Sequence, residues 1–213
     1  MDNGIRAIVF DLDGVICHTD RYHYLAWKAL ADRLGIPFDE NVNQRLRGVS
    51  RRESLEIVLG EHSAAYSEAE KQALAEEKNE IYKTYLAAMT PDALSPEART
   101  TLQILRQHGY LLAIGSSSRN TRQILERLGL GNFFDAVADG TQITRSKPDP
   151  EVFLLAASLL GVKAEDAVVV EDAASGVQAA VTGGFRVVGL CNGGNDPGAD
   201  VTIRKLSNLA EVL

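Results

Sequence analysis

Short apolar runs alternate with longer amphipathic segments along most of the chain. Runs typical of buried strands occur at Ile5–Phe10, Leu111–Ile114, Val168–Val170 and Arg186–Leu190, with a weaker one at Ala136–Val137. Segments with helical spacing separate most of these runs, and this alternation predicts a parallel sheet covered by helices on both faces. In sheets of this kind, ligands bind at the carboxyl ends of the strands.

Two proline-containing segments mark helix starts. Ser95-Pro96-Glu97 places a serine N-cap before a proline at the first helical position, and Gly109 is expected to end that helix. Asp149-Pro150-Glu151 repeats the pattern before a helix that should end near Gly161.

One long stretch, from about Thr19 to about Ala88, contains no convincing strand. Its helical segments are Asp20–Leu34, Arg51–Leu59 and Ser67–Ala88. Helices alone between the first and second strands indicate an inserted helical cap. The sequence therefore predicts an α/β protein, a Rossmann-like doubly wound parallel sheet with an inserted all-helical cap domain. The expected domains are a core of residues 1–16 and 91–213 and a cap of residues 17–90.

Composition narrows the classes of partner. With 213 residues and 45% hydrophobic content, the chain can bury a domain core plus an insertion. The net charge of −7 argues against nucleic acid and anionic membranes as partners. No run resembles a spanning helix or an export signal, and Cys17 and Cys191 lack metal-ligand spacing. We therefore expect reduced thiols in the cytoplasm, a disulfide between the two cysteines being the weaker alternative, and we separately expect a monomer.

Two aspartates follow the first apolar run. Asp11 and Asp13 come where the strand is expected to end, and Gly14 then turns the chain, so the loop should aim both carboxylates. A carboxylate at the end of a buried strand needs water or a cation, which suggests a hard-metal site. One carboxylate can also attack phosphorus while a second transfers a proton. The alternative for this segment alone is a plain turn.

Three further polar sites fall where strands should end. The loop Ser116–Asn120 offers hydroxyls and backbone N–H groups to an anion, with a plain serine N-cap as the alternative. Lys147 lies in a loop stiffened by two prolines, where a solvated side chain is the alternative. Glu171 and Asp172 follow Val168–Val170, and a helix N-cap role for Asp172 would leave Glu171 unexplained.

Together these groups fit phosphoryl transfer. Two acidic pairs could hold Mg²⁺, the hydroxyls could bind phosphoryl oxygens, and the lysine could neutralise developing charge. An anionic substrate needs such local positive charge, because the chain as a whole is acidic.

These sites, in this order, resemble the four motifs of the haloacid dehalogenase superfamily of phosphotransferases. The motifs are Asp11-Leu12-Asp13-Gly14-Val15, Ser116, Lys147 and Glu171-Asp172. The resemblance covers essentially the whole chain, and the helical insertion matches the C1 cap of that superfamily. Three cap segments are also similar to the β-phosphoglucomutase family, namely Thr19–Leu30, Leu46–Leu55 and Glu77–Asn79.

The resemblance implies a role for each matching residue. Asp11 would be the nucleophile and Asp13 the general acid/base, with Thr19, His23 and Lys78 positioning Asp13. Mg²⁺ would be held by Asp11, the Asp13 carbonyl, Asp172 and Glu171, and the transferring phosphoryl group by Ser116 and Lys147. The sugar and its distal phosphate would contact Gly14, His23, Trp27, Arg47, Gly48, Val49, Ser50, Arg51, Lys78, Ser117, Ser118, Arg119 and Asn120.

Three of the cap residues also have plainer explanations. His23 and Trp27 share one face of a predicted helix. A histidine there is more often packed than functional. For the tryptophan, packing in the core and lining the sugar pocket are equally expected and compatible. Arg51 could be an ordinary exposed residue. Yet it forms a basic cluster with Arg47 and Arg52 in an acidic chain, and a guanidinium suits a phosphate.

The resemblance further implies the reaction. It would be the Mg²⁺-dependent interconversion of β-D-glucose 1-phosphate and glucose 6-phosphate through an aspartyl phosphate and a 1,6-bisphosphate, with a small-molecule sugar phosphate as the only partner. A sugar-phosphate phosphatase is the first alternative, because a phosphomutase that admits water hydrolyses its substrate. A catalytically silent binding or regulatory relative is the second, and intact Asp11, Asp13, Lys147 and Asp172 argue against it.

Overall fold

The computed structural model describes residues 4–46, 49–191 and 198–213. The chain forms two compact units, one of Met1–His18 with Thr90–Leu213 and the other of Thr19–Met89. We call the first the core unit and the second the cap unit. The cap unit is one continuous segment, whereas the core unit combines a short N-terminal piece with the whole C-terminal part of the chain.

The core unit is built on a parallel sheet. In its described residues the strands are ordered β3-β2-β1-β4-β5-β6, and every neighbouring pair is parallel. Their bounds are β1 Ala7–Phe10, β2 Leu111–Gly115, β3 Ala136–Ala138, β4 Ala167–Glu171, β5 Arg186–Leu190 and β6 Val201–Ile203. Phe10 aligns with Ile114 of β2 and Val170 of β4. The three central strands therefore end at nearly the same level, at the point where strand order reverses.

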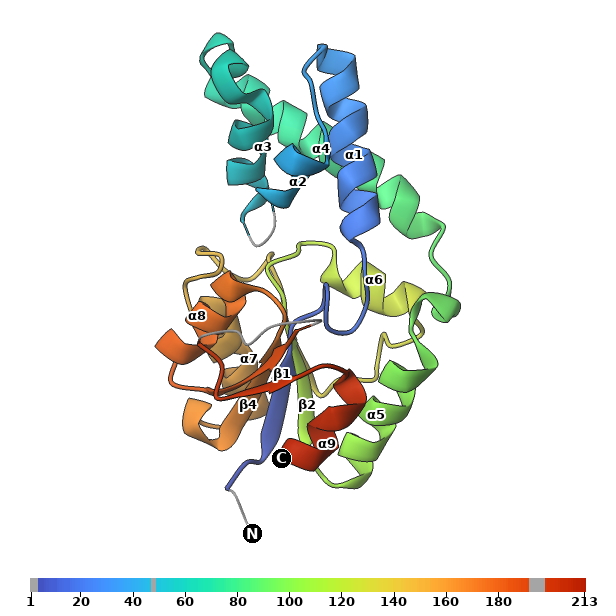
Figure 1. Cartoon of the computed structure of the whole chain (residues 1–213), viewed down its shortest axis with the longest axis vertical. Coiled ribbons are helices and arrows are strands. Elements are labelled where there is room, and N and C mark those ends of the chain that lie inside the picture. Colours follow the sequence, from blue (N-terminus) through green and yellow to red (C-terminus); the bar gives the residue numbers. More distant parts are fainter. Residues whose placement is uncertain (1–3, 47–48, 192–197) are drawn as a thin grey trace. The chain divides into compact units, whose positions relative to one another are not determined.

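Helices cover both faces of this sheet (Figure 1). Ala7 and Val9 share a buried cluster with side chains of α7 and α8, whereas Ile8 and Phe10 are just as buried but lie outside that cluster. Because successive strand side chains point to opposite faces, Ile8 and Phe10 face the other layer, where Figure 1 draws α5. The helical elements of this unit are η2 Pro91–Ala93, α5 Pro96–Gln107, α6 Thr121–Arg127, α7 Glu151–Leu160, η3 Ala164–Asp166, α8 Ala174–Thr182, η4 Leu206–Asn208 and α9 Leu209–Val212.

The cap unit contains helices and, in its described residues, no strand. Its elements are α1 Asp20–Leu34, α2 Glu40–Gln44, α3 Arg51–Leu59, the 3₁₀ helix η1 Gly60–Ala65 and α4 Glu68–Ala87. Helices α3 and α4 each begin with a capping box, formed by Ser50 with Glu53 and by Ser67 with Glu70. Residues of α1, α3 and α4 share one buried apolar cluster that includes Trp27.

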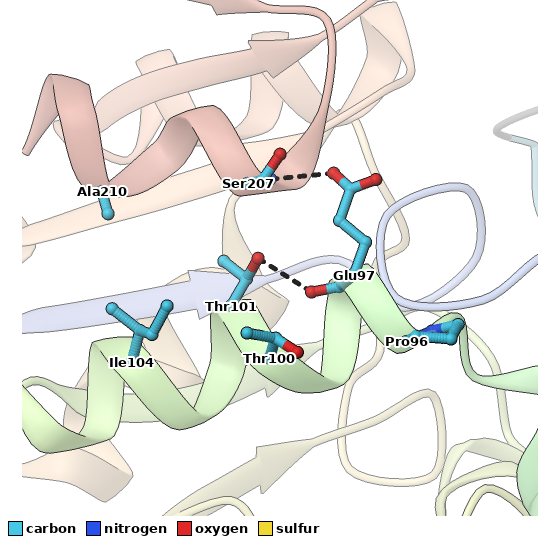
Figure 2. A pocket seen from close by; sticks show the side chains of 7 residues that line it. All are labelled: Pro96, Glu97, Thr100, Thr101, Ile104, Ser207 and Ala210. Atoms are coloured by element: carbon cyan, nitrogen blue, oxygen red, sulfur yellow. Dashed lines mark hydrogen bonds between the residues drawn. The ribbon is translucent and has the colours of Figure 1, made fainter.

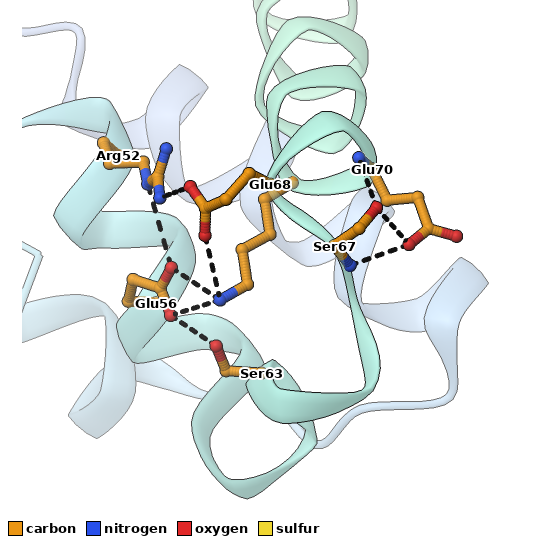
Figure 3. Close-up of polar contacts among 7 residues, drawn as sticks. Arg52, Glu56, Ser63, Ser67, Glu68 and Glu70 are labelled. Carbon is orange, nitrogen blue, oxygen red and sulfur yellow. Dashed lines mark hydrogen bonds and ion pairs between the residues drawn. The ribbon is translucent and has the colours of Figure 1, made fainter.

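An ion-pair network joins α3 to α4 (Figure 3). Arg52 pairs with Glu68, and Lys71 lies 3.0 Å from Glu56 and 3.9 Å from Glu68. Arg52 also approaches Glu56 at 3.8 Å. Single exposed ion pairs contribute little, but these four charges form a connected set around a mostly buried lysine. The network therefore helps to fix α3 against α4 within the cap unit.

The structure confirms the α/β class, the parallel sheet and the helix–strand alternation. β1 ends at Phe10, so the following loop carries Asp11 and Asp13, as expected. The predicted start of one helix is wrong by one residue, because α7 begins at Glu151 and its N-cap is Pro150 instead of Asp149. The Asp149 side chain still accepts a hydrogen bond from Glu151 N at 3.0 Å. Strand β6 was not predicted, since a three-residue edge strand carries no sustained pattern.

None of the helices in the described ranges combines the length and the apolarity that crossing a bilayer requires.

Candidate active site

The carboxyl ends of β1 and β4 bring three carboxylates together. Asp11 directly follows β1, Glu171 ends the neighbouring strand β4, and Asp172 comes next. One carboxylate oxygen of each residue lies within 4.8 Å of the others. Asp11 N donates to Val170 O at 2.9 Å, so backbone pairing with β4 continues one residue beyond β1. The register of two adjacent strands thus places Asp11 beside the predicted acidic pair of Glu171 and Asp172.

A tight turn follows Asp11 and holds the half-buried Asp13. Gly14 N donates to Cys17 O at 2.7 Å, and Gly14 has a φ of 100°, which lies in the left-handed region that favours glycine. A Cβ at position 14 would lie 2.2 Å from Asp172 Oδ2. Gly14 therefore both turns the chain and leaves room for the Asp172 carboxylate.

Lys147 links two of these carboxylates. Its ammonium donates to Asp11 Oδ1 and, at 2.7 Å, to Glu171 Oε2, and the side chain is buried. The solvated alternative for Lys147 is therefore wrong. Burial by itself would lower the pKa of Lys147, but the charges of Asp11 and Glu171 outweigh burial and raise this pKa. Lys147 is accordingly a cation throughout the physiological pH range.

The loop that carries Lys147 is held from within by the start of α7. Glu151 accepts hydrogen bonds from Thr144 N at 3.0 Å and from Arg145 N at 2.8 Å. These backbone hydrogen bonds lower the pKa of Glu151, so its carboxylate stays ionised and keeps both bonds. The loop therefore presents Lys147 from a fixed backbone.

The acidic set suits a hard divalent cation. Glu171 is 1% exposed, and burial together with the charge of Asp11 raises the pKa of Glu171 to about 8 despite the nearby Lys147. Three acidic groups thus share a largely buried place with a single ammonium, and a further cation there would favour the ionised form of Glu171. Oxygen donors of this kind are the ligands that Mg²⁺ prefers, so Asp11, Glu171 and Asp172 fit the predicted metal site.

The loop after β2 carries the predicted hydroxyl cluster. Ser116 Oγ accepts from Ser118 N at 3.2 Å, and Ser118 Oγ accepts from Asn120 N, also at 3.2 Å. The N-cap of α6 is Asn120, so none of the serines is its N-cap. Ser117 Oγ differs from its neighbours, because it is buried and, among the described residues, has no hydrogen-bond partner. An unpaired buried hydroxyl is costly, so Ser117 is a ready donor for a ligand.

The cap unit has a buried polar cluster of its own. Lys78 Nζ donates to His23 Nδ1 at 2.8 Å and lies 4.9 Å and 4.7 Å from the ring centroids of Trp27 and Tyr82. The Tyr82 hydroxyl donates to Thr19 Oγ1 at 2.9 Å, and the Tyr82 ring stacks on His23 with centroids 4.1 Å apart. Aromatic rings thus surround the Lys78 ammonium in place of water.

His23 is neutral in this cluster. Burial, followed by the charges of Lys78 and Arg51, lowers the pKa of His23 well below its usual value. Because Nδ1 accepts from Lys78, the ring proton of neutral His23 lies on Nε2. The cluster therefore offers an N–H donor in addition to the lysine charge.

Arg51 is held at the start of α3 by side chains of α4. Its guanidinium donates to Asn79 Oδ1 at 2.9 Å and lies 3.6 Å from Glu76. The Arg51 side chain is 25% exposed, so it is neither buried in a structural pair nor fully solvated. Such an arginine is oriented and still accessible to an anion.

The predicted site residues fall into one set in each unit. The core unit carries Asp11, Asp13, Gly14, Ser116, Ser117, Ser118, Arg119, Asn120, Lys147, Glu171 and Asp172, and the cap unit carries Thr19, His23, Trp27, Val49, Ser50, Arg51 and Lys78. Arg47 and Gly48 lie outside the described residues. Trp27 is 3% exposed in the apolar cluster of the cap, which favours the packing role that we considered for it.

Sequence reasoning did not assign Tyr82 or Asn79 to the site. Tyr82 follows Lys78 by four residues on α4, so helical spacing could have indicated that both contact the same surroundings. Asn79 contacts Arg51 across two helices, and no local pattern predicts such a pair.

A hollow of about 310 Å³ lies elsewhere in the core unit, between α5 and the C-terminal segment (Figure 2). It is lined by Pro96, Glu97, Thr100, Thr101, Ile104, Ser207 and Ala210. Glu97 accepts a hydrogen bond from Ser207 N at 3.0 Å, which joins the two segments. The lining holds one carboxylate and none of the predicted site residues, so we assign it no catalytic role.

The fold and the site together define a class of enzyme. A sequence model of haloacid dehalogenase-like hydrolases matches residues 5–184, which is most of the chain. The chain belongs to this family, and it is an enzyme of the phosphotransferase type. This result sets aside the alternative of a catalytically silent binding or regulatory relative.

Individual relatives carry more specific names. The chain is 42% identical to β-phosphoglucomutase of Bacillus subtilis over 207 residues, covering 96% of this chain and 92% of the relative. It is 33% identical to the phosphorylated carbohydrates phosphatase of Thermotoga maritima, covering 90% and 88% of the two chains. The crystal structure of β-phosphoglucomutase from Clostridium difficile superimposes with a TM-score of 0.90 at 35% identity, covering 96% of this chain and 93% of that one.

The neutral state of His23 should be visible in the pH dependence of stability. Because its pKa is lowered by folding, the unfolded chain binds more protons below about pH 6.5, so stability should fall as pH decreases through that value. One such proton is worth about 1.4 kcal/mol per pH unit. Between pH 7 and 5.5, wild type should lose about 1 kcal/mol more unfolding free energy than His23→Gln, measured by urea unfolding with Trp27 fluorescence.

The exposed His62 provides the control for this measurement. His62→Gln should lose as much unfolding free energy as the wild type over the same pH range. Equal losses in the wild type and His23→Gln would show that His23 titrates normally.

The unpaired hydroxyl of Ser117 should act on stability and ligand binding in opposite directions. Ser117→Ala removes a buried group without a partner, so the melting temperature should rise by about 1–4 °C. The same change should weaken binding of inorganic phosphate by about 3- to 10-fold, measured by calorimetry. Ser118→Ala, which removes the bond to Asn120 N, should instead lower the melting temperature. A destabilised Ser117→Ala with unchanged phosphate binding would refute this interpretation.

Proposed function

We propose that this chain is a β-phosphoglucomutase that interconverts β-D-glucose 1-phosphate and glucose 6-phosphate. The observation that carries the proposal is the setting of Arg51: Asn79 orients its guanidinium and leaves it accessible to a second phosphate. A simple phosphatase does not need such a second phosphate site. The names of the Bacillus and Clostridium relatives support the same reading.

In the proposed reaction Asp11 carries the phosphoryl group as an aspartyl phosphate. A sugar hydroxyl attacks the phosphorus, the bond from phosphorus to the Asp11 oxygen breaks, and Asp13 takes the hydroxyl proton. The resulting 1,6-bisphosphate reorients, and Asp11 attacks its other phosphorus. Asp13 then returns the proton to the departing sugar oxygen, which leaves a monophosphate and a phosphorylated Asp11.

Lys147 and the serine loop would bind the transferring group. The Lys147 ammonium, fixed between Asp11 and Glu171, offsets the negative charge that repels a phosphate from a carboxylate nucleophile. Ser116 and the unpaired Ser117 hydroxyl would donate to phosphoryl oxygens.

Mg²⁺ is the expected cofactor. Asp11, Glu171, Asp172 and the Asp13 carbonyl would hold it. When bound, it neutralises negative charge on the phosphoryl oxygens. Asp11 would therefore serve both as a ligand and as the nucleophile.

The cap residues would recognise the rest of the substrate. Arg51 would bind the phosphate that is not being transferred, and Lys78 with the Nε2–H of His23 would place donors around the sugar and Asp13. We propose that cap closure over the bound sugar excludes water and so favours transfer over hydrolysis. A monomer in the cytoplasm is also proposed, since two cysteines without metal-ligand spacing fit a reducing compartment.

The alternative function is that of a sugar-phosphate phosphatase, which the name of the Thermotoga relative favours. Incubation with β-glucose 1-phosphate, Mg²⁺ and a trace of glucose 1,6-bisphosphate separates the two. A mutase should form glucose 6-phosphate at least about 10-fold faster than it releases inorganic phosphate. Asp11→Asn is the inactive control, because an amide side chain attacks phosphorus poorly. Phosphate release as the main outcome would favour the phosphatase.

The sharpest prediction concerns Arg51. Binding energy from a remote phosphate orients the reacting end, so Arg51→Ala should reduce kcat/KM for the sugar phosphate by about 30- to 1000-fold, or about 2–4 kcal/mol. Hydrolysis of a small aryl phosphate, which has no distal phosphate, should hardly change.

Arg52→Ala is the matched control for this variant, because Arg52 is the next residue and pairs with Glu68 in the ion-pair network. It should leave both activities within about threefold. Equal losses on both substrates in Arg51→Ala would indicate a core catalytic or folding role for Arg51.

A further inference from the structure

Gly176 lies in the first turn of α8, five residues after Glu171, and it is buried. Its φ is not in the positive range that would call for glycine. Glycine destabilises the interior of a helix relative to alanine, so the backbone of α8 gives no reason for a glycine at this position. The reason has to come from what lies against it.

A side chain at this position would occupy the place of the Glu171 carboxylate. A Cβ on residue 176 would lie 1.9 Å from Glu171 Oε2, 2.1 Å from Cδ and 2.5 Å from Cγ. All three distances are far inside van der Waals contact, so residue 176 and Glu171 cannot both keep their positions if residue 176 has a Cβ.

Glu171 cannot move aside without losing its partners. Oε1 accepts from the backbone N–H groups of Asp172 and Ala173, each at 3.1 Å, and Oε2 accepts from Lys147 at 2.7 Å. The side chain is 1% exposed, so water could not replace these partners without a wider rearrangement. Any rotation that relieves the overlap breaks bonds at one oxygen or both.

We propose that Gly176 is a positioning residue for the metal site, which acts by having no side chain. The missing Cβ allows the Glu171 carboxylate to contact Lys147 and to lie near Asp11 and Asp172. Gly14 leaves similar room for Asp172, but its positive φ already requires a glycine, whereas the three atoms nearest to a Cβ at position 176 all belong to Glu171. The proposal rests on the acidic site of the proposed function and is independent of the sugar substrate.

The test is the affinity of Gly176→Ala for Mg²⁺, measured by titration calorimetry on the full chain. The displaced Glu171 should weaken Mg²⁺ binding by about 10- to 100-fold. The melting temperature should fall by about 2–10 °C, although alanine favours a helix. Gly131→Ala is the matched control, because its φ is also not positive and its nearest Cβ neighbour would be Glu126 Cγ at an ordinary 3.5 Å. This control should retain Mg²⁺ affinity and melting temperature.

A double-mutant cycle with Glu171→Ala identifies the source of the effect. Once the Glu171 side chain is removed, the methyl group of Ala at position 176 has room, so the second change should leave the melting temperature unaltered or raise it. The same fall in both backgrounds would show that α8 packing, and not Glu171, requires the glycine. Unchanged Mg²⁺ affinity in Gly176→Ala would also overturn the proposal. If the chain proved not to be a mutase, the expected falls in Mg²⁺ affinity and melting temperature would stay the same, so the two proposals fail separately.

Discussion

The structure of the core depends on one buried ammonium shared between carboxylates. Lys147 contacts Asp11 and Glu171 directly, and Asp172 lies next to both acids, so three acidic groups meet one ammonium. Such a set is unfavourable in a low-dielectric place unless its geometry is fixed and a cation completes it. The same imbalance raises the pKa of Glu171, and in the proposed function a bound Mg²⁺ would relieve it.

The sheet and its loops supply that fixed geometry. Asp11 and Glu171 come from adjacent parallel strands whose register is set by buried apolar residues, and Lys147 comes from a loop that the Glu151 carboxylate holds. Close packing completes the arrangement, since each of two acids lies against a glycine. The chemistry of the site is therefore inseparable from the backbone spacing around it.

In the described part of the cap unit, the charged residues of the predicted site are two cations, Lys78 and Arg51. Lys78 is surrounded by Trp27, Tyr82 and a neutral His23, and Arg51 is oriented by Asn79. Aromatic faces hold an ammonium without neutralising it, and in the proposed function this positive charge would serve an anionic substrate. In the proposed function, an acidic chain with a net charge of −7 would thus rely on a few selected cations to attract the sugar phosphate.

The sequence by itself determined most of the strand–helix alternation, the helical insertion and the acidic and lysine motifs, because apolar runs mark buried strands and residues such as Ser95 and Gly161 mark helix ends. Only the tertiary structure decided which side chains meet. The pairing of Arg51 with Asn79, the stacking of Tyr82 on His23 and the space that Gly176 leaves for Glu171 all join elements by packing. Such contacts have no local pattern, since they depend on the register of strands and the approach of helices, which the whole core determines together.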